Sequence, residues 1–195
     1  MTTLTNLRTQ LKRRVGREMS DDLCDDLLNG ALSDLSLEAD WPWLDRKWTF
    51  TTVSGQTEYT LPSVVRSIES VVVNVDEWFP YSTADADSQL RWGYTIANDV
   101  LTFYPEPPSA QTCTVRAVQM DTPLSGGGDS PLLPSQYTPA LVELAAAGAW
   151  EQLDPVEGRH VAAQRRYERR LGVMRRVETR DARPVLPRVR PGGIL

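Results

Sequence analysis

Leucine and valine recur at helical spacing near the start of the chain. Leu4, Leu7, Leu11 and Val15 are three or four residues apart, which predicts an amphipathic helix with a basic outer face. Ser20 then offers a side-chain cap to a second helix, which we expect to run to about residue 40. Since this second helix opens with aspartates, the sequence predicts an antiparallel hairpin in which basic and acidic faces meet.

After Trp41-Pro42-Trp43-Leu44 the period changes from helical to alternating, which indicates strands. Residues 48–52 and 57–61 are expected to form a hairpin around Gly55. A long β-branched run covers residues 64–75, and a second hairpin joins 94–96 to 101–104 through Asn98 and Asp99. With a last strand at 113–118, this predicts five or six short antiparallel strands.

Helical patterning resumes after a loop that we expect to be flexible, because it holds three consecutive glycines at 126–128. Pro139 suits the first turn of an alanine-rich helix. Asp154, Pro155 and Glu157 form a capping pattern for a fourth helix. The residues expected on its inward side are Val161, Tyr167, Leu171 and Met174.

Together these elements predict an α+β fold, a bundle of four helices with a small antiparallel sheet inserted in it. Residues 1–47 form the amino-terminal helical hairpin, and residues 48–120 the inserted β region. Residues 121–136 form the flexible loop, and residues 137–178 the two helices that complete the bundle. Prolines and glycines make residues 179–195 an extended tail rich in arginine and proline.

Charge is distributed unevenly along the 195 residues. The net charge is −5, but ten basic and 23 acidic residues up to Gly158 give −13, whereas eleven arginines and three acidic residues after it give +8. Arginine forms forked contacts with carboxylates and phosphates and keeps its charge when desolvated. This asymmetry favours docking to a partner over catalysis.

The composition also argues against several classes of protein. No apolar run approaches the roughly 20 residues that cross a bilayer, so we expect no contact with a membrane. No secretory signal is recognisable, so synthesis in a cytoplasm is expected. Cys24 and Cys113 are far apart without neighbouring ligands, which predicts two buried thiols and neither a disulfide framework nor a zinc site.

The sequence offers few candidate catalytic residues, so we expect that the protein is not an enzyme and binds no cofactor. His160 is the single histidine and lies among arginines. The glycine run lacks the Lys-Ser/Thr that completes a phosphate-binding loop. Clustered carboxylates could hold a divalent ion or supply a glycosidase pair, but compensation of the helix dipole explains them more simply. This cluster comprises Asp21, Asp22, Asp25 and Asp26.

Several stretches, in their order and spacing, resemble the adaptor, or head-to-tail connector, proteins of tailed bacteriophages, which are also known as head completion proteins. The resemblance spans about residues 4–176 and is weakest after Arg176. The stretches that carry it are the two amino-terminal helices, DWPWL at 40–44, TTVSGQTEYTLP at 51–62, VLTFYPEPP at 100–108, LLPSQYTPALVELAAAGAW at 132–150 and the final charged helix.

The resemblance implies a structural virion protein of the neck, at the head-tail interface. Such proteins assemble as a ring, usually of twelve copies, beneath the portal protein, and enclose a channel for passing genomic DNA without reading its sequence. The opposite side of the ring receives the tail or the next neck protein. In such proteins the carboxy-terminal segment typically contacts the portal. We therefore expect the portal contact at Arg175, Arg176, Arg183, Arg188, Val189, Arg190, Ile194 and Leu195.

The contact that faces the tail is expected at Gly55 and at the stretch containing Trp78, Phe79 and Tyr81. For Trp78 and Phe79 an alternative is packing beneath the sheet. Two other functions stay open: a nucleic-acid-binding protein that uses the arginine-rich carboxy terminus, and, less favoured, a cell-wall hydrolase that uses clustered acids.

Overall fold

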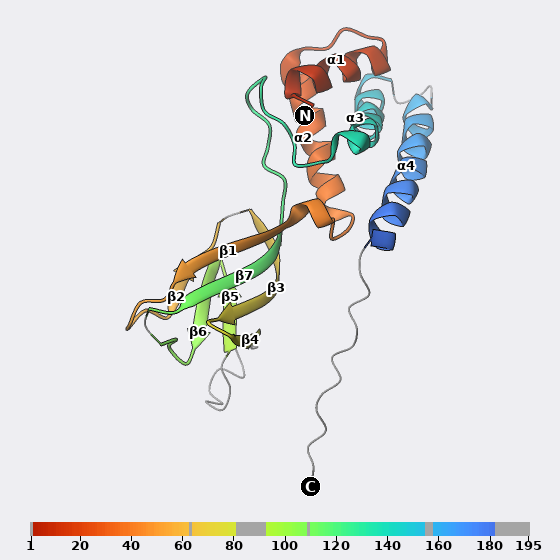
Figure 1. The fold of residues 1–195 in the computed structure, drawn as a ribbon. Coiled ribbons are helices and arrows are strands. Elements are labelled where there is room, and N and C mark those ends of the chain that lie inside the picture. Colours follow the sequence, from red (N-terminus) through yellow and green to blue (C-terminus); the bar gives the residue numbers. More distant parts are fainter. Residues whose placement is uncertain (1, 63, 81–92, 109, 155–157, 182–195) are drawn as a thin grey trace.

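In the computed structural model, the helices gather at one end of the molecule and the strands at the other (Figure 1). The structure describes residues 2–62, 64–80, 93–108, 110–154 and 158–181. Over this part of the chain the helices are α1 (Leu4–Val15), α2 (Asp21–Leu37), α3 (Thr138–Leu153) and α4 (Arg159–Asp181), with short 3₁₀ turns η1 (Pro42–Leu44) and η2 (Ser135–Tyr137).

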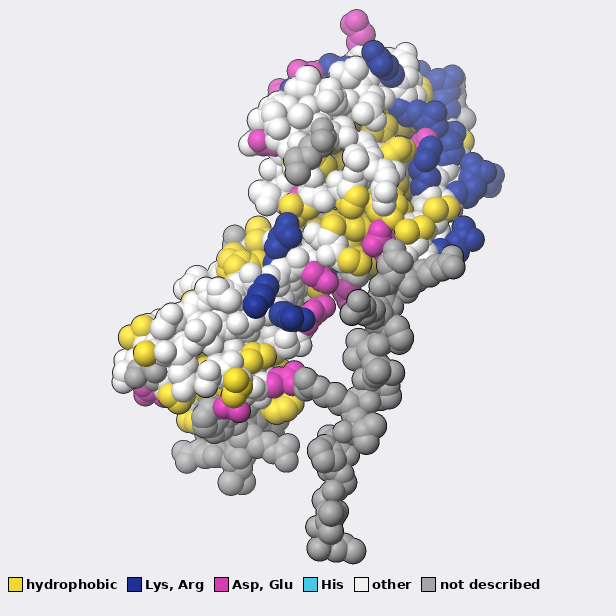
Figure 2. Space-filling view, viewed as in Figure 1, with side chains coloured by type: hydrophobic (Ala, Val, Ile, Leu, Met, Phe, Trp, Pro, Cys, Tyr) yellow, Lys and Arg dark blue, Asp and Glu magenta, His cyan; other side chains and the backbone are white. Residues whose placement is uncertain are grey.

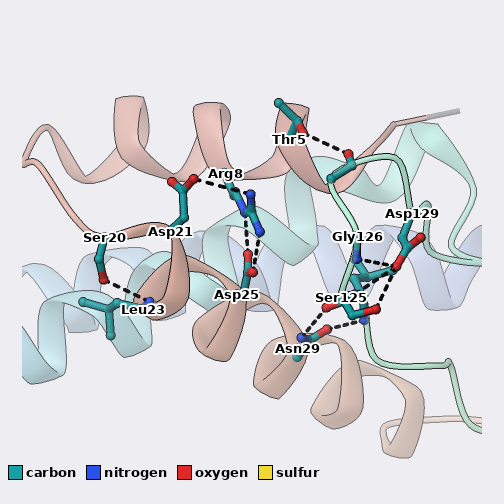
Figure 3. A network of polar contacts seen from close by, with 12 residues as sticks. Thr5, Arg8, Ser20, Asp21, Leu23, Asp25, Asn29, Ser125, Gly126 and Asp129 are labelled. Atoms are coloured by element: carbon teal, nitrogen blue, oxygen red, sulfur yellow. Dashed lines mark hydrogen bonds and ion pairs between the residues drawn. The ribbon is translucent and has the colours of Figure 1, made fainter.

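The expected amino-terminal hairpin is confirmed. The hydroxyl of Ser20 accepts a hydrogen bond from the amide of Leu23 at 3.2 Å and so caps α2. Arg8 of α1 donates to both carboxylate oxygens of Asp25, at 2.6 and 2.5 Å, and Lys12 donates to Asp21 at 2.7 Å (Figure 3 shows the Arg8 contacts). The hydrogen bond to Asp25 raises the pKa of Arg8, and the one from Lys12 lowers the pKa of Asp21.

Helix α3 lies among the other three helices and is buried on almost every side. Its small residues allow close approach, as its alanine content predicted; Gly148 lies where an added Cβ would come within 3.3 Å of Leu27 of α2. Tyr167, Leu171 and Met174 of α4 are buried as expected, whereas Val161 is 41% exposed, so its predicted inward position is wrong. The helix also extends to Asp181, three residues beyond its predicted end.

The glycine-rich loop before η2 is attached to α1 by its backbone. The amides of Leu4 and Thr5 donate to the carbonyls of Asp129 and Gly127, at 2.8 and 3.1 Å. The Asp129 carboxylate accepts from the amides of Gly126 and Ser125 at 2.7 and 2.9 Å (Figure 3). These hydrogen bonds, foremost that of Gly126, lower the pKa of Asp129. Composition suggested a flexible segment, but at these positions it is fixed.

The β region is larger than expected, and the predicted small antiparallel sheet inserted in a helical bundle is wrong. Within the described residues, seven strands form one mixed sheet in the order β1-β7-β3-β4-β5-β6-β2, and the pair β4·β5 is parallel. The strands are β1 (Asp45–Thr51), β2 (Glu58–Thr60), β3 (Val65–Val73), β4 (Asp76–Pro80), β5 (Gly93–Ala97), β6 (Val100–Tyr104) and β7 (Thr112–Gln119).

The expected hairpin between β1 and β2 is also wrong. Strand β1 pairs with β7, with Trp48 opposite Val115, while β2 pairs with β6. The turn at Gly55 does form, with a φ of 80°. The second predicted hairpin, β5 to β6 through Asn98 and Asp99, is confirmed. Strand β4 escaped prediction because only one of its five side chains, Trp78, is buried.

The sheet encloses a core of its own. Trp78 and Phe103 pack edge to face with ring centroids 4.9 Å apart, and Tyr59 lies 5.7 Å from Phe103. Cys113 is fully buried there, and burial raises its pKa to about 12. Cys24 is fully buried in the separate helical core. The part of the chain that the structure describes therefore forms two hydrophobic cores, each containing one cysteine.

Two strands and one arginine join the helical part to the β part. Strands β1 and β7, which are paired with each other, lead out of the helical part (Figure 1). Arg66 of β3 donates to the carbonyls of Ser36 and Ala39, at 2.5 and 3.3 Å, and pairs with Asp40. A cation at the carboxyl end of a helix is favoured by the helix dipole. The carboxyl end of α2 is thus attached to the sheet.

Candidate interaction surface on helix α4

Arginine side chains gather along α4, beside a hydrophobic patch (Figure 2). The inward stripe of α4 consists of Ala163, Tyr167, Leu171 and Met174, all buried. Successive residues of a helix turn by about 100°, so the remaining positions point to either flank or outward. These remaining positions include Arg159, Arg165, Arg166, Arg169, Arg170, Arg175 and Arg176.

One of these arginines is used inside the molecule. Arg166 donates to the Oε2 atom of Glu143 on α3 at 2.9 Å, and Arg14 of α1 donates to the same oxygen at 3.1 Å. Glu143 is only 4% exposed, so its charge requires these partners. One buried carboxylate thus connects α1, α3 and α4.

Three further arginines have local partners. Arg175 donates to the carboxylate of Glu38 at 2.6 Å, which holds α4 to the end of α2. Arg176 donates to the carbonyl of Gly172, one turn earlier in α4, at 3.1 Å. The guanidinium of Arg159 stacks on Trp150, 4.8 Å from the ring centroid. Both predicted portal-contact residues that the structure describes therefore lie on α4 and are exposed.

Arg165, Arg169 and Arg170 are exposed and show no ion-pair partner among the described residues. Two of them border a pocket of about 280 Å³ between α4, η2 and the start of α3, which we call the basic pocket. Val173, 49% exposed, lies at its edge. The residues that line it are Gln136, Tyr137, Ala140, Arg169, Arg170, Val173 and Met174.

A second hollow, of about 330 Å³, lies between α2 and α3 and reaches Gln164 of α4; we call it the acidic groove. Exposed carboxylates of Asp26, Asp34 and Glu151 line it, and none has an ion-pair partner in the described part of the chain. Gly30 and Gly148 keep part of its wall free of side chains.

The residues expected to face the tail have different environments. Trp78 is 1% exposed and packs in the sheet core, as the alternative of packing beneath the sheet predicted. Its side chain therefore offers no surface to a partner. Phe79, its neighbour, is 56% exposed. Gly55 is exposed and its amide donates to the Glu106 carboxylate. Tyr81 lies outside the described residues.

Most of the expected portal-contact residues lie beyond the part of the chain that the structure describes. These are Arg183, Arg188, Val189, Arg190, Ile194 and Leu195.

The described residues contain no group of three or more histidines, cysteines or acids that could hold a metal ion. Asp21 and Asp25 of the aspartate cluster are paired with Lys12 and Arg8. The Nδ1 atom of His160 is buried without a hydrogen-bond partner among the described residues, so no described carboxylate bonds to this atom as in a catalytic triad. No described helix has the length and apolarity to span a membrane.

Sequence reasoning missed the role of Glu143. The available signal was a single acid within the apolar run LVELAAAG, where an unpaired charge would be costly. Its partners could not be read from the sequence, since Arg14 lies 129 residues away.

Exposed charged surfaces on a helical part, next to a β part with its own hydrophobic core, are typical of a subunit that acts through contacts with other macromolecules. The comparison with protein families agrees: the model for the SU10 adaptor protein family matches residues 2–191. The chain therefore belongs to this family and is a structural adaptor protein of a bacteriophage, as the sequence resemblance predicted. The search of curated proteins gives no match.

Proposed function

We propose that the protein is a neck adaptor. Twelve copies form a ring under the portal, connect the DNA-filled head to the tail and surround the channel through which the genome passes. The carboxy-terminal segment of each copy binds the portal, with Arg175 and Arg176 at its root. The portal-binding residues within that segment are Arg183, Arg188, Val189, Arg190, Ile194 and Leu195.

The exposed arginines of α4 are the observation that carries this proposal. They precede the arginine-rich carboxy-terminal segment directly in the chain, so the positive charge extends from the folded surface into the proposed portal-binding segment. Arginine is suited to a partly buried contact with carboxylates. Twelve such segments on one portal would raise the overall affinity even if each contact were weak.

The opposite contact, to the tail or the next neck protein, is assigned to the β part. Phe79 of β4 is the most exposed aromatic side chain among the described residues of the β part, and the turn at Gly55 is exposed as well. Trp78 supports this surface from the core instead of forming it. The net negative charge of the first 158 residues would limit unspecific binding of the passing duplex to the channel wall.

Native mass spectrometry of the full chain, with and without the portal of the same phage, tests this function. We expect a twelve-copy ring on the portal. Since α4 continues to Asp181, deletion of residues 182–195 should abolish binding and leave the circular dichroism spectrum of the folded part unchanged. Replacing Arg183, Arg188 and Arg190 together by alanine should weaken binding at least tenfold.

The matched control removes three cations from the β part, by replacing Arg46, Lys47 and Arg116 with alanine. This control should bind the portal as the wild type does. Unchanged binding after the deletion would refute the assignment of the carboxy-terminal segment, and absence of any ring on the portal would refute the neck function.

Nucleic-acid binding is a second candidate, favoured by Arg165, Arg169 and Arg170 of α4, which have no ion-pair partner among the described residues. It predicts binding to short duplexes that weakens steeply between 50 and 200 mM salt. Lack of binding at low salt would eliminate it.

A further inference from the structure

The two flanks of α4 carry opposite kinds of surface. Arg170 and Val173 lie on the flank that faces η2, at the basic pocket. Gln164 and Arg175 lie on the flank that faces α2, since Gln164 borders the acidic groove and Arg175 binds Glu38. At 100° per residue, Arg170 and Arg175 point about 140° apart. The basic pocket and the acidic groove therefore open on different sides of the helical part.

We propose that these two surfaces bind each other between neighbouring copies of the chain. Arg169 and Arg170 of one copy would pair with Asp26 and Asp34 of the next, and Val173 would pack against the glycine-lined wall of the groove. This inference rests on the ring proposed above and names the surfaces that close it.

Charge complementarity identifies the partner as a second copy. In the described part of the chain, the groove carboxylates Asp26, Asp34 and Glu151 have no ion-pair partner, and neither do Arg169 and Arg170. Pairing Arg169 and Arg170 with Asp26 and Asp34 leaves none of these four charges uncompensated at a contact that excludes water. The same arginine–carboxylate chemistry already holds α3 and α4 together at Glu143.

Shape supports the same partner. Gly30 and Ala31 of α2, with Ala147 and Gly148 of α3, leave space in the acidic groove for a side chain from outside. Val173 and Val177 are 49% and 42% exposed on the opposite surface and would lose contact with water when bound. Because the two surfaces differ and do not coincide, the contact is head to tail, which generates a ring when the rotation closes.

Charge reversal tests this contact, with the full chain and the portal of the same phage and native mass spectrometry as the readout. Variant R169E/R170E and variant D26R/D34R should each reduce the fraction of assembled rings at least tenfold, because like charges then face each other. The quadruple variant that combines both pairs of substitutions should restore the fraction of assembled rings to within twofold of the wild type.

The matched control is K47E/R116E, two reversals at directly opposed positions of β1 and β7, which should leave assembly unchanged. Circular dichroism confirms that each variant folds. If all variants assemble like the wild type, or if the combined variant fails to recover while folded, this contact is refuted and the neck function stands. If the wild type forms no ring on its portal, both proposals fall.

Discussion

At the scale of single residues, the buried carboxylate of Glu143 connects three helices of the helical part. Glu143→Ala should lower the free energy of unfolding by about 1–3 kcal/mol, because it removes charged hydrogen bonds to Arg14 and Arg166, which are themselves partly exposed. Glu143→Gln should cost less, since it keeps one acceptor oxygen. Urea denaturation followed by circular dichroism measures both.

Glu168→Gln is the control for this prediction, because Glu168 is exposed on α4 and forms no ion pair within the described residues. It should change stability by less than about 0.5 kcal/mol. Equal stability of Glu143→Ala and the wild type would show that the three helices do not depend on this carboxylate.

Asp129 gives the loop before η2 a dependence on pH. Hydrogen bonds from Gly126 and Ser125 lower its pKa below the ordinary value of 3.8, so the folded loop favours the ionised carboxylate. Its contribution to stability is fully present above the unfolded pKa and is lost as pH falls through the lower folded pKa. The protection of the Leu4 and Thr5 amides, which bond to this loop, should therefore decrease in acid when hydrogen exchange is compared with the intrinsic rate at the same pH.

Asp129→Asn should remove this acid dependence while exchange near neutral pH becomes faster, because a neutral amide oxygen is a weaker acceptor. Asp22→Asn, at an exposed position of α2, serves as control. The same pH profile in the wild type and in Asp129→Asn would contradict the role of Asp129.

Single-residue features were predictable from sequence where they are local. The cap at Ser20, the positive φ angles at Asn98 and Asp99 and the burial of both cysteines follow from residue type and near neighbours. The burial of Trp78 and the exposure of Phe79 were left open, because a strand pattern does not say which face is covered until the neighbouring strands are known.

At the scale of elements, two glycines in helices should respond oppositely to substitution by alanine. Gly16 ends α1 with a φ of 69°, so Gly16→Ala should destabilise by about 1 kcal/mol. Gly172 lies within α4 with no atom within 4 Å of an added Cβ, so Gly172→Ala should stabilise by about 0.5–1 kcal/mol. Thermal unfolding measures the change in melting temperature of each variant. A change of the same sign in both would contradict the different roles assigned to Gly16 and Gly172.

Helices were predicted more accurately than strand pairing for a physical reason. A helix forms its hydrogen bonds within one segment, so the periods of α1 and α2 and their caps suffice. A strand bonds to a partner that can be remote: β1 and β7 are separated by 60 residues. The alternation at Trp48 and Phe50 predicted a strand but gave no information about its partner. The number of strands and the size of the sheet were therefore wrong.

At the scale of the whole molecule, the two cysteines report on the two cores separately. Burial raises the pKa of both thiols, so neither should react with a thiol reagent at pH 8 until its core opens. In a urea series, Glu143→Ala should shift the labelling of Cys24 to lower urea and leave that of Cys113 nearly unchanged. Peptide mass mapping distinguishes the two sites.

An equal shift at both sites would show that the helical and β parts unfold as one cooperative unit. Arg66→Ala provides a second variant, since it removes the contact of β3 with the end of α2. If this side chain couples the two parts, Arg66→Ala should increase the difference between the urea concentrations at which Cys24 and Cys113 become labelled.

The sequence also contained the charge asymmetry from which the docking function was inferred, and the family comparison agrees with that inference. The sequence did not show which arginines of α4 have ion-pair partners within the described residues, such as Arg166 and Arg175, and which have none there, such as Arg169 and Arg170. That division depends on which acids of other helices come within reach.

Strands β1 and β7 enter and leave the sheet side by side, with Asp45 opposite Val118. We therefore expect that the β part can be removed without unfolding the helices. Replacing residues 46–117 with Asn-Gly, a dipeptide that closes two-residue hairpins, should leave the helical part able to fold alone. In the neck function proposed above, related phages could exchange this module to suit a different tail while retaining the proposed portal-binding end.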